Sequence, residues 1–128
     1  MNAAAPRKIN IKAGSGVVEL SYGEQDQAEL GNSEQCYALS FEFLRVHSPS
    51  AEVRGHGQGS EVLQHGKKRV TITNIEPVGN YAIKLVFSDG HDSGLYTWPL
   101  LQNFCLNQAS LWQQYLAKLE EAGKSRDA

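Results

Sequence analysis

Apolar and polar residues alternate near the N-terminus, which is the pattern of a strand with one buried face. Isoleucines at positions 9 and 11 alternate with polar residues, a Gly-Ser-Gly turn follows at 14–16, and the alternation resumes over 18–22. We therefore expect a β-hairpin as the first element of the fold.

A short strand and one helical turn are expected after a polar interval. Residues 36–39 (CYAL) are a strand candidate, and Ser40 is a residue type that caps helices by accepting a backbone N–H bond. The apolar residues at 41–44 predict one helical turn. Over 46–59, Pro49 and three glycines interrupt any periodicity, which indicates loop and short extended chain.

The middle of the chain predicts three further strands. β-Branched residues are frequent over 67–75, and residues 81–87 show the clearest period of two in the sequence. The connection at 76–80 contains Pro and Gly and suits an antiparallel hairpin. The Asp-Gly pair in 88–90 marks a tight turn, after which a third strand is expected over 95–97.

One long helix is expected toward the C-terminus. From Leu111 to Leu119, apolar side chains recur at every fourth position with polar residues between them, which is the period of an amphipathic helix. Asn103 and Asn107 are both candidate N-caps, and Gly123 stands where a left-handed C-cap would fall.

Together these elements predict an α+β fold: an antiparallel β-sheet built of hairpins, with a short helical turn and one C-terminal α-helix that covers one face. Residues 1–6 and 123–128 carry no hydrophobic period, so we expect disordered tails at both ends. The folded unit is then a single domain over 7–122. A chain of 128 residues, 41% hydrophobic and 20% charged, has enough apolar material for one core.

The charge and the cysteine content limit the classes of partner and the cellular compartment that we expect for this protein. With 12 basic and 14 acidic residues the formal charge is −2, so we expect no nucleic-acid partner. The two cysteines have the spacing of neither a zinc site nor a disulfide framework, which suits a reducing cytoplasm. The sequence has no signal-peptide pattern and no apolar stretch of membrane-spanning length, so we expect a cytoplasmic protein with no membrane partner.

Few motifs for catalysis are present in the sequence. The chain has no Walker motif, no dinucleotide fingerprint, no GxSxG elbow and no HExxH helix. Glu52, Arg54 and His56 occupy alternate positions, so an extended backbone would place all three side chains on one face. Such a face suits anion binding or proton transfer. The alternative, which is the commoner situation, is an ordinary solvated ion-pair edge.

A second polar group surrounds His91. Asp89 and Asp92 flank it in a predicted tight turn, and two carboxylates beside an imidazole offer ligands for a metal ion, with His56 as a further ligand. The alternative is that Asp89 accepts backbone N–H bonds in its turn while His91 is a partly exposed strand residue.

Several separated motifs resemble a family of small bacterial proteins, the domain of unknown function DUF971, which is similar to the N-terminal domain of γ-butyrobetaine hydroxylase. In chain order the motifs are 43–46 (FLRV), 48–56 (SPSAEVRGH), 77–82 (PVGNYA), 89–94 (DGHDSG) and Trp98. The resemblance covers nearly the whole expected folded unit. It implies the fold of that N-terminal domain without the hydroxylase activity, which belongs to a separate oxygenase domain.

In the hydroxylase, the N-terminal domain binds a structural zinc through three cysteines and one histidine. The resemblance places the cysteine positions at Ser48, Ser50 and Val53 and the histidine at His91. Hydroxyl and isopropyl groups cannot replace thiolates at a tetrahedral zinc, so no cofactor is expected, and zinc or iron at His91 is kept as an alternative. Related domains are fused to P-loop ATPases of the iron-sulfur carrier type, which implies a helper role beside such carriers.

The sequence therefore predicts a small non-enzymatic accessory module that docks onto another protein, with an iron-sulfur carrier ATPase or an oxygenase as the partner. The docking surface is expected in the segment 45–56 and the neighbouring turn 89–94, and its partner-binding residues are Arg45, Ser48, Ser50, Glu52, Arg54 and His56. The alternative function is metal binding by His91, His56, Asp89 and Asp92. A third hypothesis is an enzyme with Glu52 and His56 as an acid-base pair, which requires a concave pocket beside them.

Overall fold

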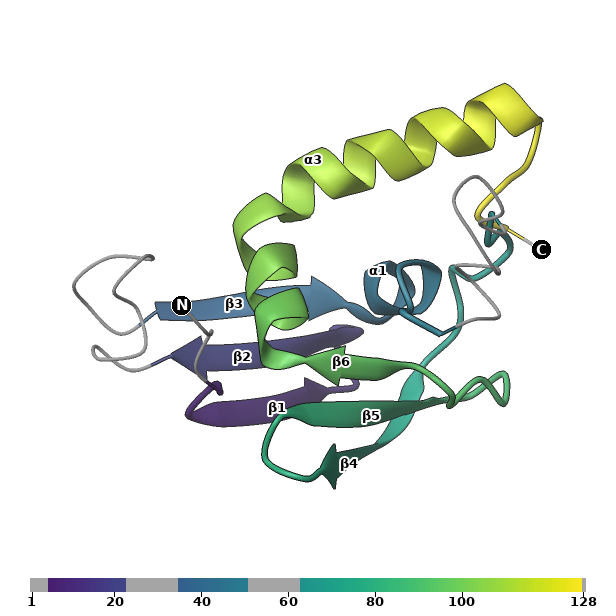
Figure 1. The fold of residues 1–128 in the computed structure, drawn as a ribbon. Helices are drawn as coiled ribbons and strands as arrows, with labels where there is room; N and C mark the ends of the chain where they lie inside the picture. The colour runs from purple at the N-terminus through teal and green to yellow at the C-terminus, as the bar shows by residue number, and fades with distance from the viewer. Residues whose placement is uncertain (1–4, 23–34, 51–62, 128) are drawn as a thin grey trace.

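The computed structural model of the protein describes residues 5–22, 35–50 and 63–127, which form two three-stranded antiparallel sheets and two helices (Figure 1). The strands pair in the orders β1-β2-β3 and β4-β5-β6. The fold class is α+β, as the sequence predicts, with the hairpins divided between two sheets. The elements are β1 (Lys8–Lys12), β2 (Val17–Tyr22), β3 (Gln35–Ser40), α1 (Phe41–Val46), β4 (Ile72–Val78), β5 (Ala82–Phe87), β6 (Leu95–Thr97) and α3 (Trp98–Ala122).

The first sheet follows the alternation seen in the sequence. β1 and β2 pair with Ile11 opposite Val18, and the turn between them contains Gly16, whose φ of 67° is adopted readily only by glycine. On β2 the side chains of Val18, Leu20 and Tyr22 are buried and the residues between them are less so. The opening hairpin is therefore confirmed.

The second sheet contains the strands expected from the middle of the chain, with one change of boundary. β4 extends to Val78 and includes Pro77, which was expected in the connection to the next strand. The proline nitrogen carries no hydrogen and cannot donate a ladder hydrogen bond, so proline is tolerated on the unpaired side of an edge strand. β4 is such an edge strand. Gly79, at φ 55°, then contributes to the turn into β5.

The six-residue helix α1 has no exposed side. Ser40 is its N-cap and accepts a hydrogen bond from the Phe43 amide at 2.9 Å, as predicted. All six side chains are buried, including those of Glu42 and Arg45. Charged groups inside a fold need partners, and both of these find theirs in distant parts of the chain.

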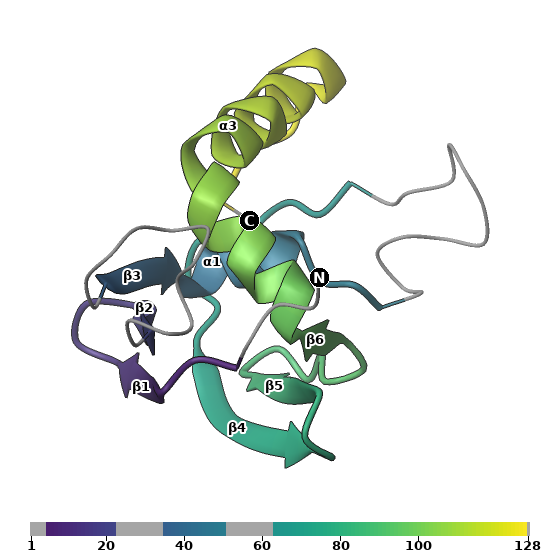
Figure 2. The same ribbon diagram turned by 60° about the vertical axis from the view of Figure 1, so that its left-hand side comes forward.

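The long helix α3 begins earlier than the sequence pattern indicates. Thr97 is its N-cap and accepts a bond from the Leu100 amide at 3.4 Å. Asn107 departs from helical geometry (φ −121°, ψ 19°), and its side-chain amide donates to Asn103 Oδ1 at 2.7 Å. The prediction of an N-cap at either asparagine is therefore wrong, since the pair marks a kink. Figures 1 and 2 show the two halves of α3 running in different directions.

The sequence of the first half of α3 shows no amphipathic periodicity, because apolar residues occupy most positions over 98–106. Three of them, Leu101, Phe104 and Cys105, are buried in the core. The second half confirms the predicted amphipathic helix, which ends at Gly123 in the left-handed conformation (φ 67°). Within the described residues, no helix has both the length and the apolar character needed to cross a membrane.

One core joins both sheets to the two helices. Phe43 of α1 meets Phe104 of α3 edge to face, with ring centroids 5.2 Å apart. Tyr96 of β6 is fully buried and donates its hydroxyl to the Leu44 carbonyl at 2.6 Å. Through these contacts α1 is fixed between β6 and the first half of α3, and the chain that leaves α1 starts from a defined position.

The residues after α3, which were expected to form a disordered tail, contact an earlier part of the chain in the structure. In Figure 1 the chain turns back at the end of α3, and the segment 123–127 then pairs with the backbone around residue 67. The Gly66 amide donates to the Ser125 carbonyl at 2.9 Å, and the Lys68 amide donates to the Arg126 carbonyl at 3.2 Å. These bonds attach the end of the chain to a segment some sixty residues earlier.

Arg126 holds this C-terminal segment in place. Its guanidinium donates to both carboxylate oxygens of the buried Glu42, at 2.7 to 3.1 Å. The same guanidinium lies 5.3 Å from the centre of the Trp112 ring. The charge buried in α1 therefore binds the segment 123–127 through Arg126.

We predict that Arg126→Ala lowers the free energy of unfolding by about 2 kcal/mol, because it leaves the Glu42 carboxylate buried without its cation. Urea unfolding followed by circular dichroism measures the change. The exposed neighbour Lys124 serves as control, and Lys124→Ala should change stability by less than about 0.5 kcal/mol. Equal effects of the two substitutions would contradict the role given to Arg126.

Candidate functional site

A cluster of two serines and one histidine lies inside the fold where the loop after α1 meets the turn before β6. The Ser48 hydroxyl is 2.8 Å and the Ser50 hydroxyl 3.3 Å from His91 Nε2. All three residues are buried, with 1%, 4% and 6% of their surface exposed. The Ser50 amide also donates to the Ser48 hydroxyl at 3.3 Å. We call Ser48, Ser50 and His91 the serine-histidine cluster.

The turn that carries His91 is shaped to admit the serines. The Phe87 amide donates to the His91 carbonyl at 3.0 Å, and the two rings lie 5.9 Å apart. At Gly94 a Cβ atom would overlap the Ser48 hydroxyl and would lie 3.0 Å from Pro49 Cδ. Only glycine therefore lets the backbone before β6 approach the loop after α1 this closely.

An ion network adjoins the cluster and ties in a third segment. Asp89 Oδ2 accepts from Arg45 Nε at 3.0 Å and from Lys67 Nζ at 2.9 Å, and Asp89 Oδ1 accepts from the His91 amide at 3.3 Å. Arg45 also donates to Gln64 Oε1 at 3.0 Å. These bonds join α1, the segment before β4 and the turn after β5 at one end of the molecule.

The environment of Asp89 keeps its carboxylate charged. Burial by itself would raise the pKa of Asp89, but hydrogen bonds from Lys67, the His91 amide and Arg45, together with the Arg45 charge, lower the pKa from 3.8 to about 2. The group is therefore an ion-pair partner at any physiological pH.

The side-chain atoms of the serine-histidine cluster can be compared with the ligands that a structural zinc ion requires. The resemblance implies that Ser48, Ser50 and His91 correspond to zinc ligands of the hydroxylase, and the structure does bring their side chains together. Two neutral hydroxyls and one imidazole do not make the donor set of a structural zinc site, so these three residues do not fit zinc. Within the described ranges, no three His, Cys, Asp or Glu side chains gather as metal ligands.

Ser48 and His91 also have the contact distance of a nucleophile and its base. The Ser48 hydroxyl is buried and lies under Gly94, so a substrate has no access to it in this conformation. The arrangement supports a structural hydrogen bond that fastens the loop to the turn.

The structure places the predicted site residues in three groups. Arg45, Ser48 and Ser50, expected at a partner surface, have buried side chains that bond within the chain. Of the proposed metal ligands, His91 joins the two serines, Asp89 binds Arg45 and Lys67, and Asp92 is exposed. The remaining predicted residues, Glu52, Arg54 and His56, lie outside the described residues.

Sequence reasoning missed Lys67 and Gln64 as partners of the network. Lys67 belongs to a run of three basic residues, and such runs are usually solvated, so nothing local distinguishes it. Gly94 belongs to a motif of the family resemblance, but only the approach of the Ser48 loop explains why a glycine is needed there.

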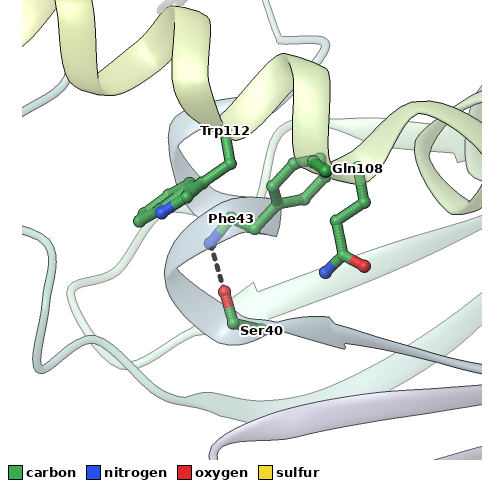
Figure 3. Close-up of a pocket in the computed structure, with 5 residues that line it drawn as sticks. Ser40, Phe43, Gln108 and Trp112 are labelled. Carbon is green, nitrogen blue, oxygen red and sulfur yellow. Dashed lines mark hydrogen bonds between the residues drawn. The ribbon is translucent and has the colours of Figure 1, made fainter.

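A mainly apolar hollow of about 270 Å³ lies near the kink of α3 (Figure 3). Phe43 and Trp112 form its wall, with ring centroids 6.4 Å apart. Its polar groups are already bonded, since Ser40 caps α1 and Gln108 donates to the carbonyl of Ala38 on the edge strand β3 at 3.0 Å. This hollow shares no lining residue with the serine-histidine cluster, and none of its described lining residues is titratable.

Comparison with known proteins agrees with the motif resemblance. Residues 9–102 match the family model "Gamma-butyrobetaine hydroxylase-like, N-terminal". A protein solved by NMR in solution is 48% identical, with a TM-score of 0.79 over 98% of this chain and 92% of its own. A second NMR structure is 46% identical, with a TM-score of 0.77 over 98% of this chain and 86% of its own.

A crystal structure from Acidithiobacillus ferrooxidans ATCC 23270 is also similar, and its protein has unknown function and belongs to the DUF971 family. It is 32% identical, with a TM-score of 0.57, and the match covers 77% of this chain and 89% of that one. No curated protein matches the chain.

We predict that Gly94→Ala destabilises the protein by about 2 kcal/mol, because the added methyl group must displace Ser48 and Pro49. Gly14→Ala is the matched control, since a Cβ at Gly14 meets nothing within 4 Å, and should cost less than about 0.5 kcal/mol. Thermal and urea unfolding of both variants give the comparison. An unaffected Gly94→Ala protein would show that the loop does not pack against the turn as described.

We predict a pH-dependent loss of stability for Asp89→Asn. Because folding lowers the pKa of Asp89 to about 2, the charged carboxylate stabilises the fold above about pH 4, and this contribution is lost as pH falls toward 2. After allowance for solvent screening we expect a loss of about 1 kcal/mol at neutral pH. The difference in the free energy of unfolding between wild type and Asp89→Asn should disappear in acid. The substitution of the exposed Asp92, Asp92→Asn, should leave the free energy of unfolding unchanged. A gap that is constant with pH would rule out the ion network as its source.

Proposed function

Since the chain belongs to the gamma-butyrobetaine hydroxylase-like N-terminal family, we propose that it is a small accessory module that docks onto another protein and catalyses no reaction of its own. The docking surface is the end of the molecule where the loop after α1 meets the turn 89–94. The proposed partner is an iron-sulfur carrier ATPase or an oxygenase, the two classes suggested by the motif resemblance.

One observation carries the proposal: the polar groups at this end bond to one another. His91 is engaged by two serines, and Asp89 by Arg45 and Lys67. A catalytic site would keep such groups accessible to a substrate, whereas a docking surface needs them to hold its loops in one shape before the partner arrives. Preorganisation of this kind lowers the entropy lost on binding.

In this proposal, the predicted partner-binding residues with buried side chains support the docking surface and do not contact the partner. Arg45, Ser48 and Ser50 hold the loop from within, and the contacts to the partner come from the segment that follows, with Arg54 and His56 as the predicted residues. The turn 89–94 contributes the exposed Asp92 to the proposed surface.

The test is binding of the purified full chain to a purified iron-sulfur carrier ATPase and to a purified oxygenase of the same cell, by calorimetry. We expect one of them to bind, and Arg54→Ala with His56→Ala to weaken binding at least about tenfold, or about 1.4 kcal/mol. The control is Lys8→Ala with Lys12→Ala on β1, which Figures 1 and 2 show away from the C-terminal end, and it should bind as wild type.

Two results would contradict the docking proposal. One is binding of neither partner class by the wild-type chain, and the other is equal binding by the wild type and the Arg54 and His56 double variant. Titration with zinc and with iron(II) belongs to the same experiment, because a stoichiometric ion that raises the melting temperature would favour the metal-binding function instead.

A further inference from the structure

A basic hollow lies beside the C-terminal segment, at the same end of the molecule as the serine-histidine cluster. It has a volume of about 300 Å³, and the residues that line it are Gly66, Lys68, Arg69, Arg126 and Asp127. The hollow exists because the C-terminal segment is bonded to the backbone at Gly66 and Lys68. It is therefore built from two segments that are far apart in the sequence.

Positive charge is in excess around this hollow. The cations of the hollow and of the adjoining ion network are Arg45, Lys67, Lys68, Arg69 and Arg126. Among the residues that the structure describes, the carboxylates that pair with them are those of Glu42, Asp89 and Asp127. These described residues therefore carry two more positive than negative charges, whereas the formal charge of the whole chain is −2.

Two of these cations are available to a ligand. Within the described ranges, Lys68 is paired only with Asp127 at 3.8 Å, and this pair is weak because 50% and 65% of the two side chains are exposed. Arg69 is exposed, and in the described part of the chain it has no carboxylate within 4.0 Å. The other three are held by Asp89 and by the buried Glu42.

We propose that the basic hollow binds an acidic segment of the partner protein, with Lys68 and Arg69 contacting its carboxylates. This inference deepens the proposed docking function and rests on it. Arg126 lines the hollow and is held in place by its three hydrogen bonds to Glu42 and by the Trp112 ring.

Carboxylates fit the hollow better than phosphate does. Phosphate sites usually combine cations with several free backbone N–H groups, and here the Gly66 and Lys68 amides already donate to Ser125 and Arg126. An exposed guanidinium and an ammonium group remain, and each can bind one carboxylate. The hollow is also continuous with the docking surface, because Lys67 binds Asp89 while its neighbour Lys68 lines the hollow.

The test is an NMR titration of the 15N-labelled full chain with an acetylated hexaglutamate peptide at about 0.15 M ionic strength. We expect amide shifts concentrated at 66–69 and 125–127, and none from a hexaserine peptide. Lys68→Glu with Arg69→Glu should weaken hexaglutamate binding at least about tenfold. The matched charge reversal, Lys8→Glu with Lys12→Glu, should leave it unchanged, and thermal unfolding confirms that both variants are folded.

Three outcomes would overturn the proposal: no amide shifts at the hollow with hexaglutamate, equal weakening by both charge reversals, or inorganic phosphate saturating the same amides more tightly than the peptide. The failure of this inference differs from that of the docking function. A partner that binds the Lys68 and Arg69 variant as tightly as wild type would refute the acidic-segment site alone. Hexaglutamate binding at the hollow without binding of either partner class would refute docking alone.

Discussion

The burial of two opposite charges on one short helix organises this protein. Every residue of α1 is buried, so Glu42 and Arg45 cannot be solvated and must be paired inside the fold. Glu42 is paired with Arg126 near the end of the chain, and Arg45 with Asp89 in the turn after β5. These two pairs attach the C-terminal segment and the β5–β6 turn to the centre of the molecule.

The serine-histidine cluster fastens the loop after α1 to the turn before β6. The hydroxyls of Ser48 and Ser50 lie within hydrogen-bond distance of His91 Nε2. These contacts are shielded from water because the site is buried, and Gly94 lets the two backbones approach closely.

Several segments that are far apart in the sequence meet at one end of the molecule. There the loop after α1, the segment around Lys67, the turn at Asp89 and the C-terminal segment converge, although they are dispersed along the sequence. Each is held by a paired charge or a buried hydrogen bond. The surface they form is defined before any partner binds, which is the physical basis of the docking and acidic-segment proposals.

The sequence by itself determined the α+β class, the hairpins, the Ser40 cap, the Gly123 cap and the family, because periodicity, capping chemistry and motifs are local properties. Only the tertiary structure decided that α3 starts at Trp98 and kinks at Asn107, since its first half is apolar on most sides and is ordered by the core. The same holds for the contacts of the C-terminal segment with Gly66 and Lys68 and for the network of Arg45, Asp89 and Lys67. A charged residue has the same local pattern whether it is solvated or paired, and only the fold sets the distance to its partner.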